Sequence, residues 1–77
     1  MKVQNIHGET VRGFAVVVER PGRRPLRYPI MDGERAARLM MRLAERGCRS
    51  KALTYSDLPE SDETLDVSEM NAIFGIG

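Results

Sequence analysis

The sequence is poor in the side chains that build metal, redox and hydrolytic centres. It has one cysteine, Cys48, and one histidine, His7. A single cysteine excludes an internal disulfide, and the two residues together supply too few ligands for a four-coordinate structural zinc site. No flanking motif marks Cys48 as a nucleophile, and a lone cysteine in a strand is more often a small apolar residue. We therefore expect no cofactor, no metal site and no enzymatic activity.

Long apolar runs and aromatic side chains are also scarce. The longest apolar run, FAVVV at residues 14–18, is far below the roughly 20 residues that span a bilayer. The first residues lack the apolar core of a secretion signal. We expect a cytoplasmic protein without membrane contact. The few aromatic residues are not interleaved with the basic ones, which argues against a stacking surface for single-stranded nucleic acid.

Length and composition predict a single domain over residues 1–77. Hydrophobic residues make up 42% of the chain and charged residues 30%, which is usual for a folded soluble protein. A chain of this size buries only about 60% of the surface that it exposes when unfolded, so its core is small.

Positive and negative charges occupy different parts of the chain. All 12 Lys and Arg residues lie within residues 1–56, which hold five acidic residues and so have a balance of +7. Residues 57–77 hold six acidic residues and no basic one. The chain therefore divides into a basic body and an acidic C-terminal segment, and this asymmetry is its main functional signal.

Five arginines recur at steps of 3, 4, 4 and 3 residues, the spacing that keeps side chains on one side of an α-helix. They are Arg35, Arg38, Arg42, Arg46 and Arg49. The pattern predicts an amphipathic helix over residues 33–46, capped by Asp32 and stopped by Gly47, with its apolar side on a sheet. Adjacent like charges at this spacing cost about 0.2–0.5 kcal/mol per pair. Two interpretations stay open, a site for an anionic partner and a plain solvated surface.

Three strands are expected before this helix. A short strand covers residues 2–6, and residues 12–20 give the strongest strand signal. Because residues 14–18 are apolar on both faces, we expect a central strand or one whose second face meets a partner. A turn then leads into the strand at residues 24–31.

This return strand contains two prolines of the same parity. Leu26, Tyr28 and Ile30 alternate with polar or proline positions and should point inward. Pro25 and Pro29 remove donors from one side of the strand, so the sequence predicts an edge strand.

The predicted fold is α+β. A further strand covers residues 48–55, and a short helix within residues 65–74 begins at Asp66, with Glu69 completing a capping box. These elements give a small antiparallel sheet in the order β-β-β-α-β, packed on one amphipathic helix, followed by the short C-terminal helix.

Two further charged groups are candidate contact sites. The hairpin 20–27 carries the basic residues Arg20, Arg23, Arg24 and Arg27. Such a hairpin could follow phosphates, or it could serve only solubility. The acidic segment carries Asp57, Glu60, Asp62 and Glu63. It could contact another protein or screen the basic face by folding back on it.

From these features we expect a small non-catalytic binding protein that acts as a regulator or inhibitor on a macromolecular surface, with a protein as its partner. Small size and the lack of motifs, rather than any residue, suggest an accessory protein of a phage or mobile element. The alternative is a nucleic-acid-binding module that uses the arginine face of helix 33–46 and the hairpin 20–27. A homodimer could also form through the second face of the central strand together with Met40 and Met41.

Overall fold

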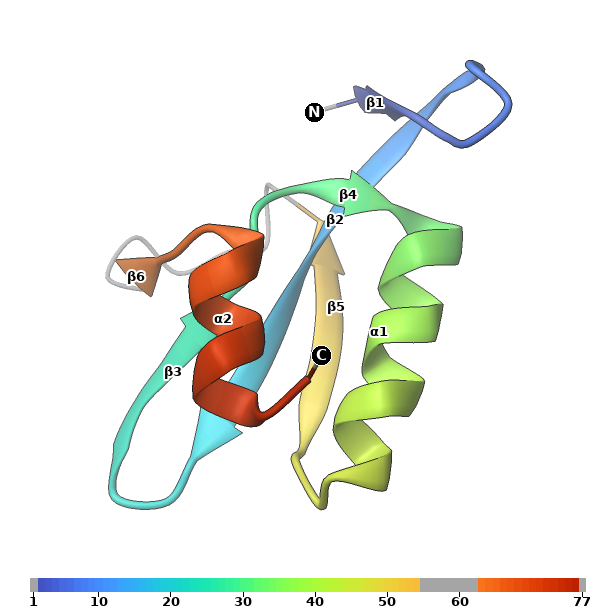
Figure 1. Cartoon of the computed structure of the whole chain (residues 1–77). Helices are drawn as coiled ribbons and strands as arrows, with labels where there is room; N and C mark the ends of the chain where they lie inside the picture. The colour runs from blue at the N-terminus through green and yellow to red at the C-terminus, as the bar shows by residue number, and fades with distance from the viewer. Residues whose placement is uncertain (1, 55–62, 77) are drawn as a thin grey trace.

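The computed structural model describes residues 2–54 and 63–76 of the chain (Figure 1). The elements follow the order β1 (Lys2–Gln4), β2 (Thr10–Arg20), β3 (Arg23–Arg27), β4 (Met31–Asp32), α1 (Gly33–Glu45), β5 (Ser50–Thr54), β6 (Glu63–Thr64) and α2 (Val67–Phe74). The predicted α+β class is confirmed, with a small, mainly antiparallel sheet and both helices packed on it. The order differs from the predicted β-β-β-α-β in having two additional short strands, β4 and β6.

The central strand is β2, as predicted. It pairs with β3 along one edge and with β5 along the other, and Val17 and Val18 have antiparallel partners on both sides. β1 and β4 pair with the first half of the same strand. The long β-branched run of β2 therefore organises the whole sheet.

Both helices cover one face of the sheet, and the core lies between them and the strands (Figure 1). Alternate residues of the sheet point toward the helices, among them Val16, Val18 and Leu26. α1 contributes Leu43 and α2 contributes Met70 to the same buried cluster. The two helices therefore pack against the same apolar layer.

The second face of β2 is also buried. Ala15 and Val17 point away from the helices, yet each exposes 2% or less of its surface. The register sets Arg27 and Lys51 on either side of Val17, and long basic side chains shield apolar neighbours with their aliphatic stems. The expectation that these residues form an exposed apolar patch for a second copy is therefore wrong. Met41 remains exposed on α1, and the homodimer stays a prediction.

The predicted return strand at residues 24–31 is divided into β3 and β4. Tyr28 continues the ladder by donating its backbone N–H to the Val16 carbonyl at 2.9 Å. The pairing then resumes at Met31 with a register shifted by one residue. Leu26 and Tyr28 are buried as predicted, whereas Ile30 is only half-buried because it lies at this irregularity.

The prediction that this strand forms an edge is wrong. β6 pairs with β3 in parallel, opposite Leu26 and Arg27. Arg27 lies between Pro25 and Pro29, and its peptide groups face outward from the sheet. Unlike the prolines, Arg27 has a backbone N–H as well as a carbonyl with which to pair. The Arg27 carbonyl accepts from the backbone N–H of Leu65 at 3.4 Å. The prolines therefore shorten the pairing on this side but do not prevent it.

The helix boundaries agree closely with those expected from the sequence. The Asp32 side chain caps α1 by accepting the Arg35 N–H at 3.2 Å, and Gly47 has the positive φ of a helix stop. α1 ends at Glu45, one residue earlier than predicted. Asp66 caps α2 by accepting the Glu69 N–H at 2.8 Å. In the described part of the chain, neither helix has the length and apolar character needed to cross a membrane.

Candidate partner-binding groove

Four of the five arginines lie on one exposed side of α1 and its C-cap. The Arg35 and Arg38 side chains are 57% and 70% exposed, and Arg42 and Arg46 are also exposed. Arg49 lies beyond Gly47 in the connection to β5, so its helical spacing has no structural meaning. The guanidinium groups are therefore accessible to a partner rather than enclosed in the fold.

Two of these arginines have acidic neighbours in the first turn of α1. Arg38 contacts Glu34 at 3.4 Å, as helical neighbours four residues apart do. The Arg35 Nε lies 3.2 Å from Oδ1 of the buried Asp32. Asp32 thus caps α1 and also offsets the positive charge that would oppose the helix dipole. Within the described residues no hydrogen bond or ion pair is made by the Arg42 side chain.

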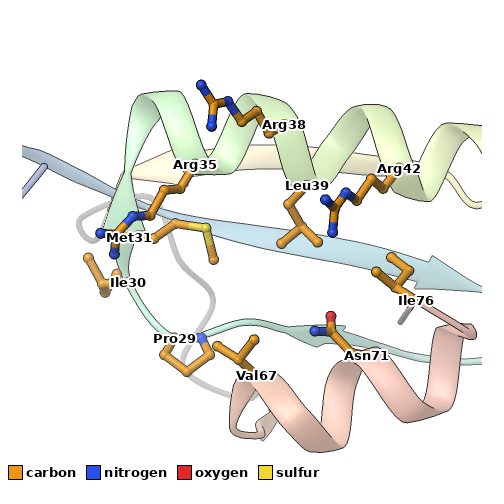
Figure 2. A pocket seen from close by; sticks show the side chains of 10 residues that line it. All are labelled: Pro29, Ile30, Met31, Arg35, Arg38, Leu39, Arg42, Val67, Asn71 and Ile76. Atoms are coloured by element: carbon orange, nitrogen blue, oxygen red, sulfur yellow. The ribbon is translucent and has the colours of Figure 1, made fainter. Parts of the chain in front are cut away.

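A groove of about 430 Å³ lies between α1 and α2. Figure 2 shows Leu39 and Arg42 pointing from α1 toward α2, and Val67 and Asn71 on the facing side of α2. Arg38 lies at the outer rim, directed away from α2. The remaining lining residues are Pro29, Ile30, Met31, Arg35 and Ile76. The groove is thus mainly apolar with cationic side chains along its α1 wall.

A hydrogen bond from the core orients Asn71, the only uncharged polar side chain among the described lining residues. The Tyr28 hydroxyl donates to the Asn71 Oδ1 at 2.9 Å. Burial raises the pKa of this hydroxyl, and the nearby Cys48 adds to the rise. Tyr28 therefore stays protonated at neutral pH and remains a donor. This bond does not use the Asn71 amide N–H groups, which can therefore donate to a ligand.

The other arginines lie apart from the groove. Arg49 and Arg20 line a separate hollow of about 510 Å³ near the β2–β3 turn, together with Phe74. Arg23 and Arg24 are exposed on β3. Arg27 is half-buried, and its Nε donates to the Thr64 hydroxyl of β6. The predicted basic set is therefore divided between the groove, the hairpin end and an internal contact.

The predicted acidic set falls mostly outside the described residues. Asp57, Glu60 and Asp62 lie outside them, and Glu63 is described only by its backbone in β6. Screening of the basic face by these carboxylates stays a prediction.

His7 and Cys48 are too far apart to act together. His7 lies in the β1–β2 turn beside the first residues of β2, whereas Cys48 lies beside its last residues. An 11-residue strand is on the order of 35 Å long. Among residues 2–54 and 63–76, no three His, Cys, Asp or Glu side chains come close enough to hold a metal ion.

Sequence reasoning missed the α2 side of the groove. Val67 and Asn71 are four residues apart and share a side of α2, and Val67 is 48% exposed although it is aliphatic. That spacing was a usable signal for a surface on α2. It could not reveal the groove, because only the tertiary structure shows that the two helices share one face of the sheet.

Comparisons with known proteins assign the chain to no family. No protein-family model matches the chain, and no significant match is found among curated proteins or solved structures. The function is therefore inferred from the site itself.

Proposed function

We propose that the chain is a non-catalytic binding protein that regulates or inhibits a partner protein by holding part of it in the groove between α1 and α2. The observation that carries this proposal is the combination of an apolar lining with the guanidinium group of Arg42, which pairs with no described residue. In protein interfaces, buried apolar contacts supply affinity and charges supply specificity. Arginine is also enriched among the residues that dominate binding energy.

The proposed setting is the cytoplasm. A single, half-buried cysteine suits a reducing compartment, in which thiols persist. The absence of any predicted nucleophile–base pair supports a role in binding rather than catalysis.

The test compares two tryptophan variants of α2 in a pull-down from the native host. Val67 lines the groove, whereas Ile73 does not line it and is 51% exposed on the same helix. The wild-type chain and Ile73→Trp should both recover a partner protein in stoichiometric amount. Val67→Trp should not recover it, because the tryptophan side chain fills the groove. Circular dichroism checks that both variants are folded. Recovery of the same partner by Val67→Trp would refute the groove as the site.

A nucleic-acid-binding module is the second candidate, and the hairpin end favours it. Arg20 and Arg49 line one hollow there, and Arg23 and Arg24 lie on the adjoining strand. Binding through several phosphates should weaken steeply with salt. Replacing Arg23 and Arg24 by serine should then reduce DNA or RNA affinity at low salt, whereas Arg42→Gln should affect it less. If neither nucleic acid binds at low salt, this candidate fails.

A further inference from the structure

We infer that the groove selects an acidic, amphipathic peptide segment, which seats one or two apolar side chains on the groove floor and directs a carboxylate to Arg42 and Asn71. This inference rests on the proposed function and names the chemistry of the partner segment. It follows from three properties of the groove: its apolar floor, its set of hydrogen-bond donors and the lack of aromatic rings among its described lining residues.

The floor of the groove is suited to aliphatic side chains. Leu39, Val67 and Ile76 line it from α1, from the start of α2 and from beyond the end of α2, respectively (Figure 2). The groove volume of about 430 Å³ is at the low end of the range for pockets that enclose a ligand. It is large enough for a few side chains but too small for a whole helix, which is about 10 Å wide. The partner therefore inserts side chains and keeps its backbone at the rim.

The described polar side chains of the groove are mainly donors. Guanidinium groups have no acceptor, and Oδ1 of Asn71 already accepts one hydrogen bond, from the Tyr28 hydroxyl. Asp32 and Glu34 neighbour Arg35 and Arg38, respectively, at the first turn of α1. No described residue pairs with Arg42, which faces α2 from the groove wall (Figure 2). A ligand with acceptors therefore fits the groove best, and a carboxylate matches a guanidinium group in both charge and geometry.

The same features disfavour nucleic acid at this site. Among the described residues no aromatic side chain lines the groove, so this lining offers no ring on which a base could stack. Most of the lining is aliphatic, which suits a leucine or isoleucine side chain better than a sugar-phosphate backbone. Apolar side chains next to carboxylates meet both requirements of the groove.

The matched variants for this inference lie on α1. Arg42 points into the groove, whereas Arg46 is exposed at the end of the same helix and does not line the groove. Arg42→Gln and Arg46→Gln remove the same charge, so their difference reports position rather than net charge. Both positions are on the surface, and neither variant alters the core.

The probe is a labelled synthetic peptide with leucines four residues apart, flanked by glutamates, and binding is measured by fluorescence anisotropy. Two control peptides carry lysine for glutamate or alanine for leucine. We expect the acidic leucine peptide to bind and both controls to bind at least roughly tenfold more weakly. Arg42→Gln should weaken binding by roughly tenfold, as expected for loss of a charge-assisted hydrogen bond. Arg46→Gln should change it by no more than about twofold. Amide chemical shifts should move at Leu39, Val67 and Asn71.

Several outcomes would overturn the inference. The lysine peptide could bind as tightly as the acidic leucine peptide, or the two arginine variants could have equal effects. Dodecanoate, a fatty acid with a carboxylate and an apolar chain, could also shift the same amides and bind more tightly than the peptide. The proposed function is tested separately by the tryptophan variants. If Val67→Trp abolishes partner capture but Arg42→Gln does not, the groove is a binding site and only its preference for acidic segments is refuted.

Discussion

The Tyr28 hydroxyl donates a hydrogen bond of 2.9 Å to the Asn71 side chain. Tyr28 is buried where β3 ends, and Asn71 lies on the groove side of α2. One bond therefore joins the sheet to the second helix and orients a side chain of the candidate site. Changes at these two positions should affect stability and binding together.

Removing either partner of this hydrogen bond should lower the free energy of unfolding, but by different amounts. Tyr28→Phe leaves a half-buried Asn71 that can turn to water, so we expect a loss of about 1 kcal/mol in the free energy of unfolding. Asn71→Ala leaves the buried hydroxyl without its partner and should cost more, about 1–3 kcal/mol. Urea denaturation measures both values. Equal losses would show that the hydroxyl finds another partner.

Titration of Tyr28 should make the fold less stable at alkaline pH. Burial raises its pKa above the ordinary value of 10.0. The unfolded chain therefore loses this proton at a lower pH than the folded chain. Stability is fully present below pH 10.0 and falls as the pH rises from there through the raised pKa. Denaturation of wild type and Tyr28→Phe between pH 8 and 11 should show a decline that is smaller in the variant. Parallel curves would contradict the prediction.

Asp32 should stabilise the fold by its negative charge as well as by capping α1. Its buried carboxylate accepts the Arg35 N–H and lies 3.2 Å from the Arg35 Nε. Asp32→Ala removes the cap and the charge, and should cost about 1–2 kcal/mol. Asp32→Asn keeps a capping side chain and should cost less. Thermal unfolding monitored by circular dichroism gives the comparison, and an equal cost for both variants would assign the contribution to the charge alone.

α1 offers a matched pair of apolar positions. Leu43 is fully buried, whereas Met41 is 67% exposed. Leu43→Ala should destabilise the fold by about 2–5 kcal/mol through lost burial and a cavity, and Met41→Ala should change stability by less than about 0.5 kcal/mol. Chemical denaturation of both variants tests this. A large loss for Met41→Ala, dependent on protein concentration, would instead indicate the predicted homodimer.

Local signals in the sequence were sufficient for the helices and the central strand. Asp32, Gly47 and Asp66 mark helix ends by side-chain and backbone chemistry that acts within a few residues, so their roles were readable without tertiary structure. The run at residues 14–18 likewise predicted a strand with neighbours on both sides.

Non-local features could not be predicted in the same way. The break after Tyr28 and the pairing of β6 with Arg27 depend on segments that meet only in the folded chain. The groove needs Leu39 and Asn71 on neighbouring helices, and nothing in either segment specifies the other. Arg49 shows the opposite error, since its spacing matched the helix although Gly47 ends the helix before it.

The prolines of β3 have a consequence for how the domain behaves at high concentration. Between Pro25 and Pro29 only Arg27 retains an outward N–H, and that short stretch is already taken by β6. A strand from another molecule that displaced β6 would gain very little backbone pairing there. The outer side of β3 should therefore resist strand exchange with another molecule, even where β6 is displaced from it.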